Sequence, residues 1–229
     1  MDVSRRARVW RHGRSRSRER MVFDGWIAGA GTSSGTRLVL GHWAHSPFGP
    51  FSDVMLERGD GHRLLLAPDR RTAGFVAGTY TFDEVRIVPV GVEVRGDTWA
   101  VSAGPLELRF TTGRRGPLGL LLRAVPRRLA VTPAWIAVVD GPARLLRGVR
   151  TRGSAGAGRR EWYGARDLRP VRRVTASYDG VGLGALAAVE PAVRFGFGST
   201  PRAPCVVRVT TTVALYGGAA TGQGRMEST

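Results

Sequence analysis

Apolar and polar residues alternate in strand-length runs over residues 84–111. In the last run, residues 106–111, every second side chain is apolar. Successive strand residues point to opposite faces of a sheet, so this run predicts a strand with one buried and one solvated face. Arg95-Gly96-Asp97 supplies residues typical of a hairpin turn. The segment therefore predicts a β-meander with strands at 84–94, 98–103 and 106–111.

Short apolar and β-branched runs recur along the rest of the chain, separated by Gly, Pro and Asp. Runs of this kind between turn residues are typical of strands. Gly59-Asp60-Gly61 and Asp179-Gly180 provide two of the turns. The further strands expected are 22–27, 36–40, 51–57, 62–66, 160–163, 172–178, 181–186, 193–197 and 206–215.

Two segments depart from the strand pattern and favour helices. Residues 68–80 begin with Pro68-Asp69, which places an acid in the first turn of a helix. Residues 117–147 favour further helices, one of which starts at Thr132-Pro133, an N-cap followed by a proline suited to the first helical position.

Many short strands and one helical insertion predict the fold class. It is mainly β (α+β): a closed or nearly closed antiparallel β-barrel with a helical insertion around 117–147. We expect one barrel domain at 21–216 and a disordered tail at 217–229. Residues 1–20 contain eight arginines and two acids, and two interpretations remain open for them. They form either a disordered basic arm for nucleic acid or an extension upstream of a true start at Met21.

Composition excludes several kinds of chemistry. All 35 basic residues are arginine, so Schiff-base catalysis and a lysine nucleophile are impossible. Cys205 is the one cysteine, which excludes an intramolecular disulfide and a thiolate metal cluster. Motifs for a serine-hydrolase elbow, a zinc-protease helix and a phosphate-binding loop are missing, and we expect no metal and no cofactor. No run reaches the roughly 18 apolar residues of a membrane-spanning helix, so a cytoplasmic location is expected.

The net charge of +17 is concentrated in one part of the chain. Residues 111–173 hold 15 arginines against 3 acids, a net charge of +12, whereas residues 51–110 carry −2. Arginine binds carboxylate or phosphate with two parallel hydrogen bonds, so this segment either attracts an acidic partner or is simply a solvated helix face. Nucleic acid is not favoured, because the segment has no recognised module and few aromatic residues. The arginines concerned include Arg114, Arg115, Arg123, Arg127, Arg128, Arg144, Arg147, Arg150 and Arg152.

Polar residues on the predicted strands supply the candidate site. His42 and His45 are three residues apart and face opposite sides of a strand, which argues against a two-histidine metal site. Asp53 and Glu57 share a strand face but are separated by roughly 13 Å of strand rise, too far for an acid/base pair acting alone. For each of these residues the alternative to lining a pocket is a structural role.

Residues 159–163 and 193–198 add a second set of candidates. Arg159, Glu161 and Tyr163 fall on one side of their strand, and Arg194 shares a strand face with two glycines. Glycines beside an arginine leave room for a ligand, and the alternative is a barrel corner where glycine permits bending. The predicted ligand-binding residues are therefore Arg159, Glu161, Tyr163, Arg194, His45 and Asp53, and no catalytic residue is assigned.

Three stretches carry a family resemblance: residues 46–55 (SPFGPFSDVM), 183–186 (LGAL) and 193–198 (VRFGFG). With the helix-bearing middle of the chain, they resemble an uncharacterised actinobacterial family whose layout is similar to the acetoacetate decarboxylase-like β-barrel superfamily. The resemblance covers roughly residues 21–215. It implies a cone-shaped barrel with an internal pocket for a small carboxylate compound. The decarboxylase's Schiff-base lysine has no counterpart in this chain.

The leading functional hypothesis is a β-barrel that binds a small organic acid or amphipathic anion, with lysine-independent catalysis left open. The alternative is an interaction protein whose basic face, residues 111–173, binds an acidic protein, a membrane surface or nucleic acid. Oligomeric state does not follow from the sequence.

Overall fold

The computed structural model describes residues 19–130, 132, 152–155, 159–196 and 200–215. Most of these residues form one mixed sheet with the strand order β5-β4-β3-β2-β1-β13-β10-β8-β7-β6, and three short strands pair beside this path. The elements are β1 (Glu19–Thr32), β2 (Arg37–His45), β3 (Phe51–Glu57), β4 (Arg63–Ala67), α1 (Arg70–Ala77), β5 (Glu84–Ile87), β6 (Val90–Arg95), β7 (Thr98–Ala103), β8 (Leu106–Thr112), α2 (Pro117–Ala124), α3 (Arg127–Ala130), β9 (Arg152–Ala155), β10 (Arg159–Tyr178), β11 (Val181–Gly182), β12 (Leu186–Ala187) and β13 (Cys205–Leu215).

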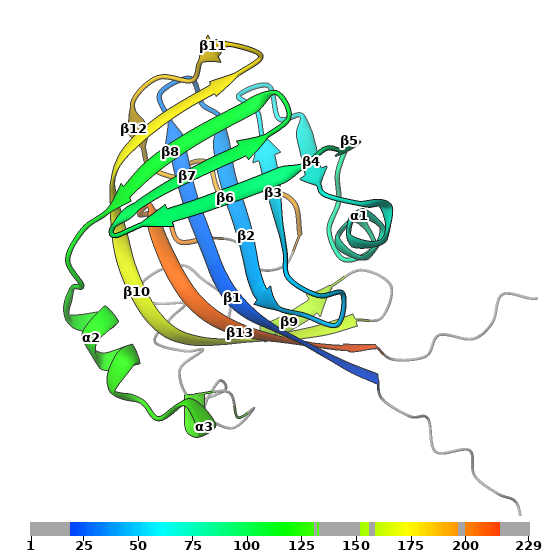
Figure 1. The fold of residues 1–229 in the computed structure, drawn as a ribbon, viewed down its shortest axis with the longest axis vertical. Coiled ribbons are helices and arrows are strands. Elements are labelled where there is room, and N and C mark those ends of the chain that lie inside the picture. The colour runs from blue at the N-terminus through cyan, green and yellow to red at the C-terminus, as the bar shows by residue number, and fades with distance from the viewer. Residues whose placement is uncertain (1–18, 131, 133–151, 156–158, 197–199, 216–229) are drawn as a thin grey trace, which may run out of the picture.

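The sheet curls strongly because β10 bends. Its first half pairs with β13 and its second half with β8, and its register shifts between Ala165 and Asp167 and again between Val171 and Arg173. An extra residue in one strand of a pair bends that strand and increases its twist. As a result β6, β7 and β8 cross over β1, β2 and β3 (Figure 1). The prediction of a mainly β, nearly closed barrel is confirmed in the form of a strongly curled half-barrel.

The two edges of the sheet are consecutive in the chain. Sequence patterning predicts one strand at 84–94, but the structure divides it at Val88 and Pro89 into β5 and β6. β5 pairs with β4 in parallel, and β6 pairs with β7 in antiparallel fashion. Proline has no backbone N–H to continue a ladder, which is why it separates the strands. The β4–β5 pair makes the sheet mixed, whereas the sequence predicted an antiparallel one.

Apolar side chains fill the inside of the curl and also cover part of its outer face. The inner core contains Leu40, Leu56, Val101 and Phe110 among its buried residues. On the outer face, α1 packs through Ala73 and Val76 against β4. The predicted helix in 68–80 is confirmed at 70–77, but Asp69 is its N-cap and not a residue of its first turn. The Asp69 side chain accepts a hydrogen bond from the Thr72 N–H at 2.8 Å.

Several predicted boundaries differ from those observed. The expected strands at 160–163 and 172–178 are parts of the single strand β10, and residues 193–196 form no strand. The insertion contains α2 and α3, while the helix expected after Thr132 lies outside the described residues. So do the tail 217–229 and nearly all of the basic extension 1–20, whose last two residues begin β1. Within the described part of the chain, no helix is long and apolar enough to cross a membrane.

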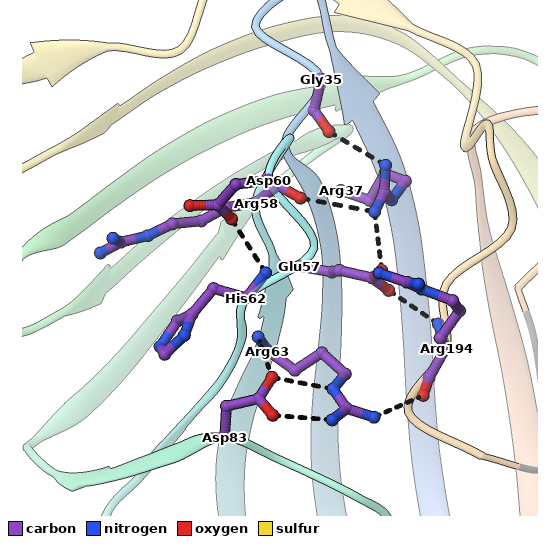
Figure 2. Close-up of polar contacts among 9 residues, drawn as sticks. All are labelled: Gly35, Arg37, Glu57, Arg58, Asp60, His62, Arg63, Asp83 and Arg194. Atoms are coloured by element: carbon purple, nitrogen blue, oxygen red, sulfur yellow. Dashed lines mark hydrogen bonds and ion pairs between the residues drawn. The ribbon is translucent and has the colours of Figure 1, made fainter.

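A fully buried carboxylate, Glu57, anchors residues 193–196 to the outer face of the sheet (Figure 2). One of its oxygens contacts Arg37 Nη2 at 2.8 Å, and its other oxygen accepts the backbone N–H of Arg194 at 2.7 Å. Burial would raise the pKa of Glu57, but these hydrogen bonds and the two arginines outweigh burial and lower it. Arg63 binds Asp83 with two parallel hydrogen bonds and reaches the Arg194 carbonyl, so the cluster also ties β4 to this segment.

We predict that Glu57→Ala lowers the free energy of unfolding by about 3–5 kcal/mol, because it leaves the buried Arg37 charge without its partner. Urea unfolding measures the change. Glu93→Ala is the matched control, since Glu93 pairs with Arg95 at the surface and is 64% exposed. Its midpoint should stay near that of the wild type. Equal losses in both variants would contradict an anchoring role for Glu57.

Candidate functional site

A pocket of about 370 Å³ opens inside the curled sheet, at the end where β6 turns into β7 and β8 ends. We call it the inner pocket. It lies beyond the apolar core, on the same inward-facing side of the strands. Its lining residues are Trp26, His42, Val94, Gly96, Trp99, Thr112, Arg115, Asp167, Arg169, Val206 and Arg208.

Aromatic rings form one wall of the inner pocket. Trp26, His42 and Trp99 lie in mutual contact, with ring centroids 5.6–6.1 Å apart. Trp99 is fixed from behind by Phe110, which stacks on it at 5.6 Å. Such contacts hold the rings in place, so the pocket presents a preformed apolar surface to a ligand.

His42 adds a polar group to this wall. Its Nδ1 lies 2.8 Å from the Ser52 hydroxyl, and Nε2 has no hydrogen-bond partner among the described residues. Burial lowers the pKa of His42, so the ring is neutral at pH 7. A neutral imidazole can donate or accept one hydrogen bond toward the pocket.

Arginines form the opposite, polar part of the lining. Arg115 binds Asp167 with two parallel hydrogen bonds, the shorter at 2.7 Å. Arg169 donates from Nε to the Gly113 carbonyl at 3.1 Å, and no carboxylate of the described residues is within ion-pair distance of it. The Arg208 guanidinium lies over the Trp26 ring, 4.5 Å from its centroid, and its side chain is 37% exposed. Cation and indole therefore offer one combined surface.

The buried carboxylate of Asp24 positions two of the arginines. It accepts hydrogen bonds from Arg166 at 2.5 Å, Arg208 at 3.1 Å and Thr210 at 3.1 Å. Burial would raise the pKa of Asp24, but Arg166, Thr210 and Arg208 outweigh it and the pKa is lowered. Both Asp24 and Arg166 lie where their strands change register, so the bulges bring them together.

Among the described residues, the charges at the inner pocket do not cancel. Four arginines (Arg115, Arg166, Arg169 and Arg208) stand against two aspartates (Asp24 and Asp167), which gives these six side chains a net charge of +2. With arginine forks and ring faces side by side, the pocket suits an anion that carries a planar apolar group.

The predicted site residues lie elsewhere in the fold. Asp53 and Tyr163 meet in a smaller cavity on the outer face of the sheet, beneath α1. Arg194 belongs to the Glu57 cluster (Figure 2), and His45 is exposed at the end of β2. The side chains of Arg159 and Glu161 lie outside the described residues. A ligand-binding role for these six residues stays a prediction.

Sequence reasoning did not single out Trp26, Trp99, Arg169 and Arg208. A usable signal was present, because Arg208 follows Val206 and Arg169 precedes Val171 at strand spacing, which puts a charge on an apolar face. Arg115 belongs to the basic segment of residues 111–173, and His42 is one of the two histidines that the sequence places three residues apart. In the described part of the chain, no three His, Cys, Asp or Glu side chains gather into a possible metal site.

No protein-family model matches this chain, and no curated protein does either. Among solved structures, the chain is similar to the acetoacetate decarboxylase of Legionella pneumophila. The TM-score is 0.38 and the sequence identity 10%, over 88% of this chain and 85% of that one. A TM-score this low does not establish a common fold, so the family resemblance stays a prediction.

We predict that Asp24→Asn lowers the free energy of unfolding by about 3–5 kcal/mol at neutral pH, because Arg166 and Arg208 lose the buried carboxylate that accepts their hydrogen bonds. Since the pKa of Asp24 is lowered from 3.8, its contribution is full above that pH and is lost as the pH falls through the lowered value. The gap between variant and wild type should therefore shrink in acid. Urea unfolding at several pH values measures it, and a constant gap would rule out the ion pair as its source.

Proposed function

We propose that this protein binds a small organic anion with a planar or aromatic portion in the inner pocket. The observation that carries the proposal is the arrangement of Arg208 over Trp26 beside Arg169, which has no carboxylate partner among the described residues. An anionic group would complete the hydrogen bonds of these guanidiniums, and its apolar part would lie against Trp26 and Trp99.

The size of the inner pocket supports a small molecule. Its volume of about 370 Å³ falls in the range of roughly 300–1,000 Å³ that is usual for such sites. Binding uses rigid strands and rings that are already in place, which limits the entropy lost on association. The resemblance to the acetoacetate decarboxylase-like superfamily implies the same ligand class, a small carboxylate.

A catalytic function would have to use groups other than lysine. In the inner pocket, neutral His42 is the side chain suited to proton transfer near pH 7, and it lies against the same rings as the proposed ligand. The geometry supports ligand binding more strongly than catalysis, because the charge, the shape and the apolar surface of the inner pocket all suit a bound anion.

The alternative of a basic interaction face on residues 111–173 remains a separate proposal. Much of this segment lies outside the described residues. Within the described part, Arg114, Arg123 and Arg128 are exposed, while Arg115 turns to Asp167 in the inner pocket. Because Arg115 and Arg169 line the inner pocket, part of the positive charge of residues 111–173 lies there.

We predict that benzoate and indole-3-acetate bind the wild type, change its tryptophan fluorescence and raise its melting temperature, while neutral benzamide does neither. Arg169→Ala and Arg208→Ala should each weaken anion binding about tenfold or more, because a hydrogen bond to a charged group contributes about 1.5–3 kcal/mol. Isothermal titration calorimetry measures the affinities.

Arg109→Ala is the control, since Arg109 is an exposed arginine on β8 away from the pocket lining. It removes the same charge and should leave the affinity unchanged. If benzamide binds as well as benzoate, or all three variants weaken binding equally, the inner pocket is not the anion site.

A further inference from the structure

A second cavity, the outer cavity, lies between α1 and the outer face of the sheet. Its volume is about 60 Å³, whereas one water molecule needs roughly 10–15 Å³. Strands β1, β2, β3, β10 and β13 contribute to its wall, and α1 covers it. The lining residues are Phe23, Ile27, Val39, Gly41, Trp43, Phe51, Asp53, Met55, Phe75, Val76, Tyr80, Tyr163, Thr211 and Val213.

One carboxyl group, that of Asp53, forms part of this mainly apolar wall. Asp53 is 3% exposed, and its Oδ1 accepts a hydrogen bond from Trp43 Nε1 at 3.3 Å. Its Oδ2 has no hydrogen-bond partner among the described residues. Gly41 leaves the space for this pair, because a Cβ there would lie 2.6 Å from Asp53 Oδ1 and 2.8 Å from Trp43 Nε1. The chain thus keeps a half-satisfied carboxyl group under α1.

A second buried polar atom of the cavity wall also lacks a partner. The hydroxyl oxygen of Thr211 is buried and makes no hydrogen bond with any described residue. Buried polar groups are nearly always hydrogen-bonded, so two incomplete groups in one cavity indicate an occupant. An occupant that donates hydrogen bonds to the Asp53 carboxylate and to the Thr211 hydroxyl would complete both groups.

Aromatic rings form a large part of the remaining wall. Phe23 packs against Trp43 and Phe75 with centroid separations of 5.7 and 5.1 Å. Trp43 in turn lies 6.5 Å from Phe51. An aromatic ring attracts a cation through its quadrupole when the cation lies over the ring, most strongly where water is excluded.

We propose that the outer cavity binds a small organic ammonium ion, with Asp53 as its counterion and Thr211 as a hydrogen-bond acceptor. This site is independent of the anion proposed for the inner pocket, because strand alternation puts the two on opposite faces of the sheet. The small volume restricts the ligand to a short alkylammonium ion. Its positive charge removes the cost of a buried, uncompensated carboxylate.

Protonation of Asp53 makes the affinity for an ammonium ion depend on pH. Burial raises the pKa of Asp53 to about 7 against the weaker effect of the Trp43 hydrogen bond. The other titratable side chains of the lining are Tyr80 and Tyr163, whose hydroxyl oxygens lie 2.7 Å apart, and no other charged side chain of the described residues lines the cavity. An ammonium ion must displace the Asp53 proton below this pKa, so affinity falls there by about tenfold per pH unit and is constant above it.

The test uses propylammonium and its neutral isostere 1-propanol, titrated into the full-length protein by NMR at about pH 8 and about pH 5.5. We expect propylammonium to bind, more tightly at the higher pH, and 1-propanol not to bind. Asp53→Asn, which mimics the protonated carboxyl group, should abolish binding, and Thr211→Val should weaken it. Asp97→Asn removes an exposed carboxylate and is the matched control, which should bind as the wild type does.

Three results would overturn the ammonium site. They are an absence of propylammonium binding to the wild type, equal binding of 1-propanol, and binding that neither Asp53→Asn nor acid reduces. The pH comparison needs no variant, so the proposal is tested even if a substituted chain fails to fold. A cavity that binds water alone would give the first of these results.

Discussion

The ion-pair cluster around Asp24 joins the bent strands on which the inner pocket is built. Its carboxylate, from β1, holds Thr210 and Arg208 from β13 and Arg166 from β10, three neighbouring strands of the sheet. Arg166 is the bulge residue at which β10 begins to curl. The contact therefore links the bend of the sheet to the orientation of Arg208 over Trp26, and a straight β10 would leave no enclosed space.

One sheet presents opposite chemistry on its two faces. Along β2 and β3, His42 and Ser52 point into the curl, while Trp43 and Asp53 point outward beneath α1. Among the described residues, the inner pocket holds more arginines than carboxylates, whereas the cavity beneath α1 holds the Asp53 carboxyl group beside aromatic rings. Strand alternation alone separates the two environments by the thickness of a sheet.

Local patterns predicted much of the fold. The strands at 98–103 and 106–111 follow from alternation, and the helix within 68–80 follows from the start signal at Pro68-Asp69. The turn at Asp179-Gly180 follows from residues that tolerate positive φ, and both of them adopt it. The break at Pro89 and the parallel β5 depend on pairing between distant strands, which no local pattern encodes. The same holds for the site. Bulges decide which residues of β10 face inward, so Arg169 could not be placed beside Arg208 before the register was known.

If the inner pocket is the anion site, Arg169 and Arg208 contact the bound anion, and side-chain NMR of arginine detects that contact. The Nε–H resonances of the protein are followed while benzoate is added. We expect the signals of Arg169 and Arg208 to shift and saturate together, while that of exposed Arg95 at the β6–β7 turn does not move. Small, unsaturable shifts spread over all arginines would contradict it, because they would show only general screening of a basic surface.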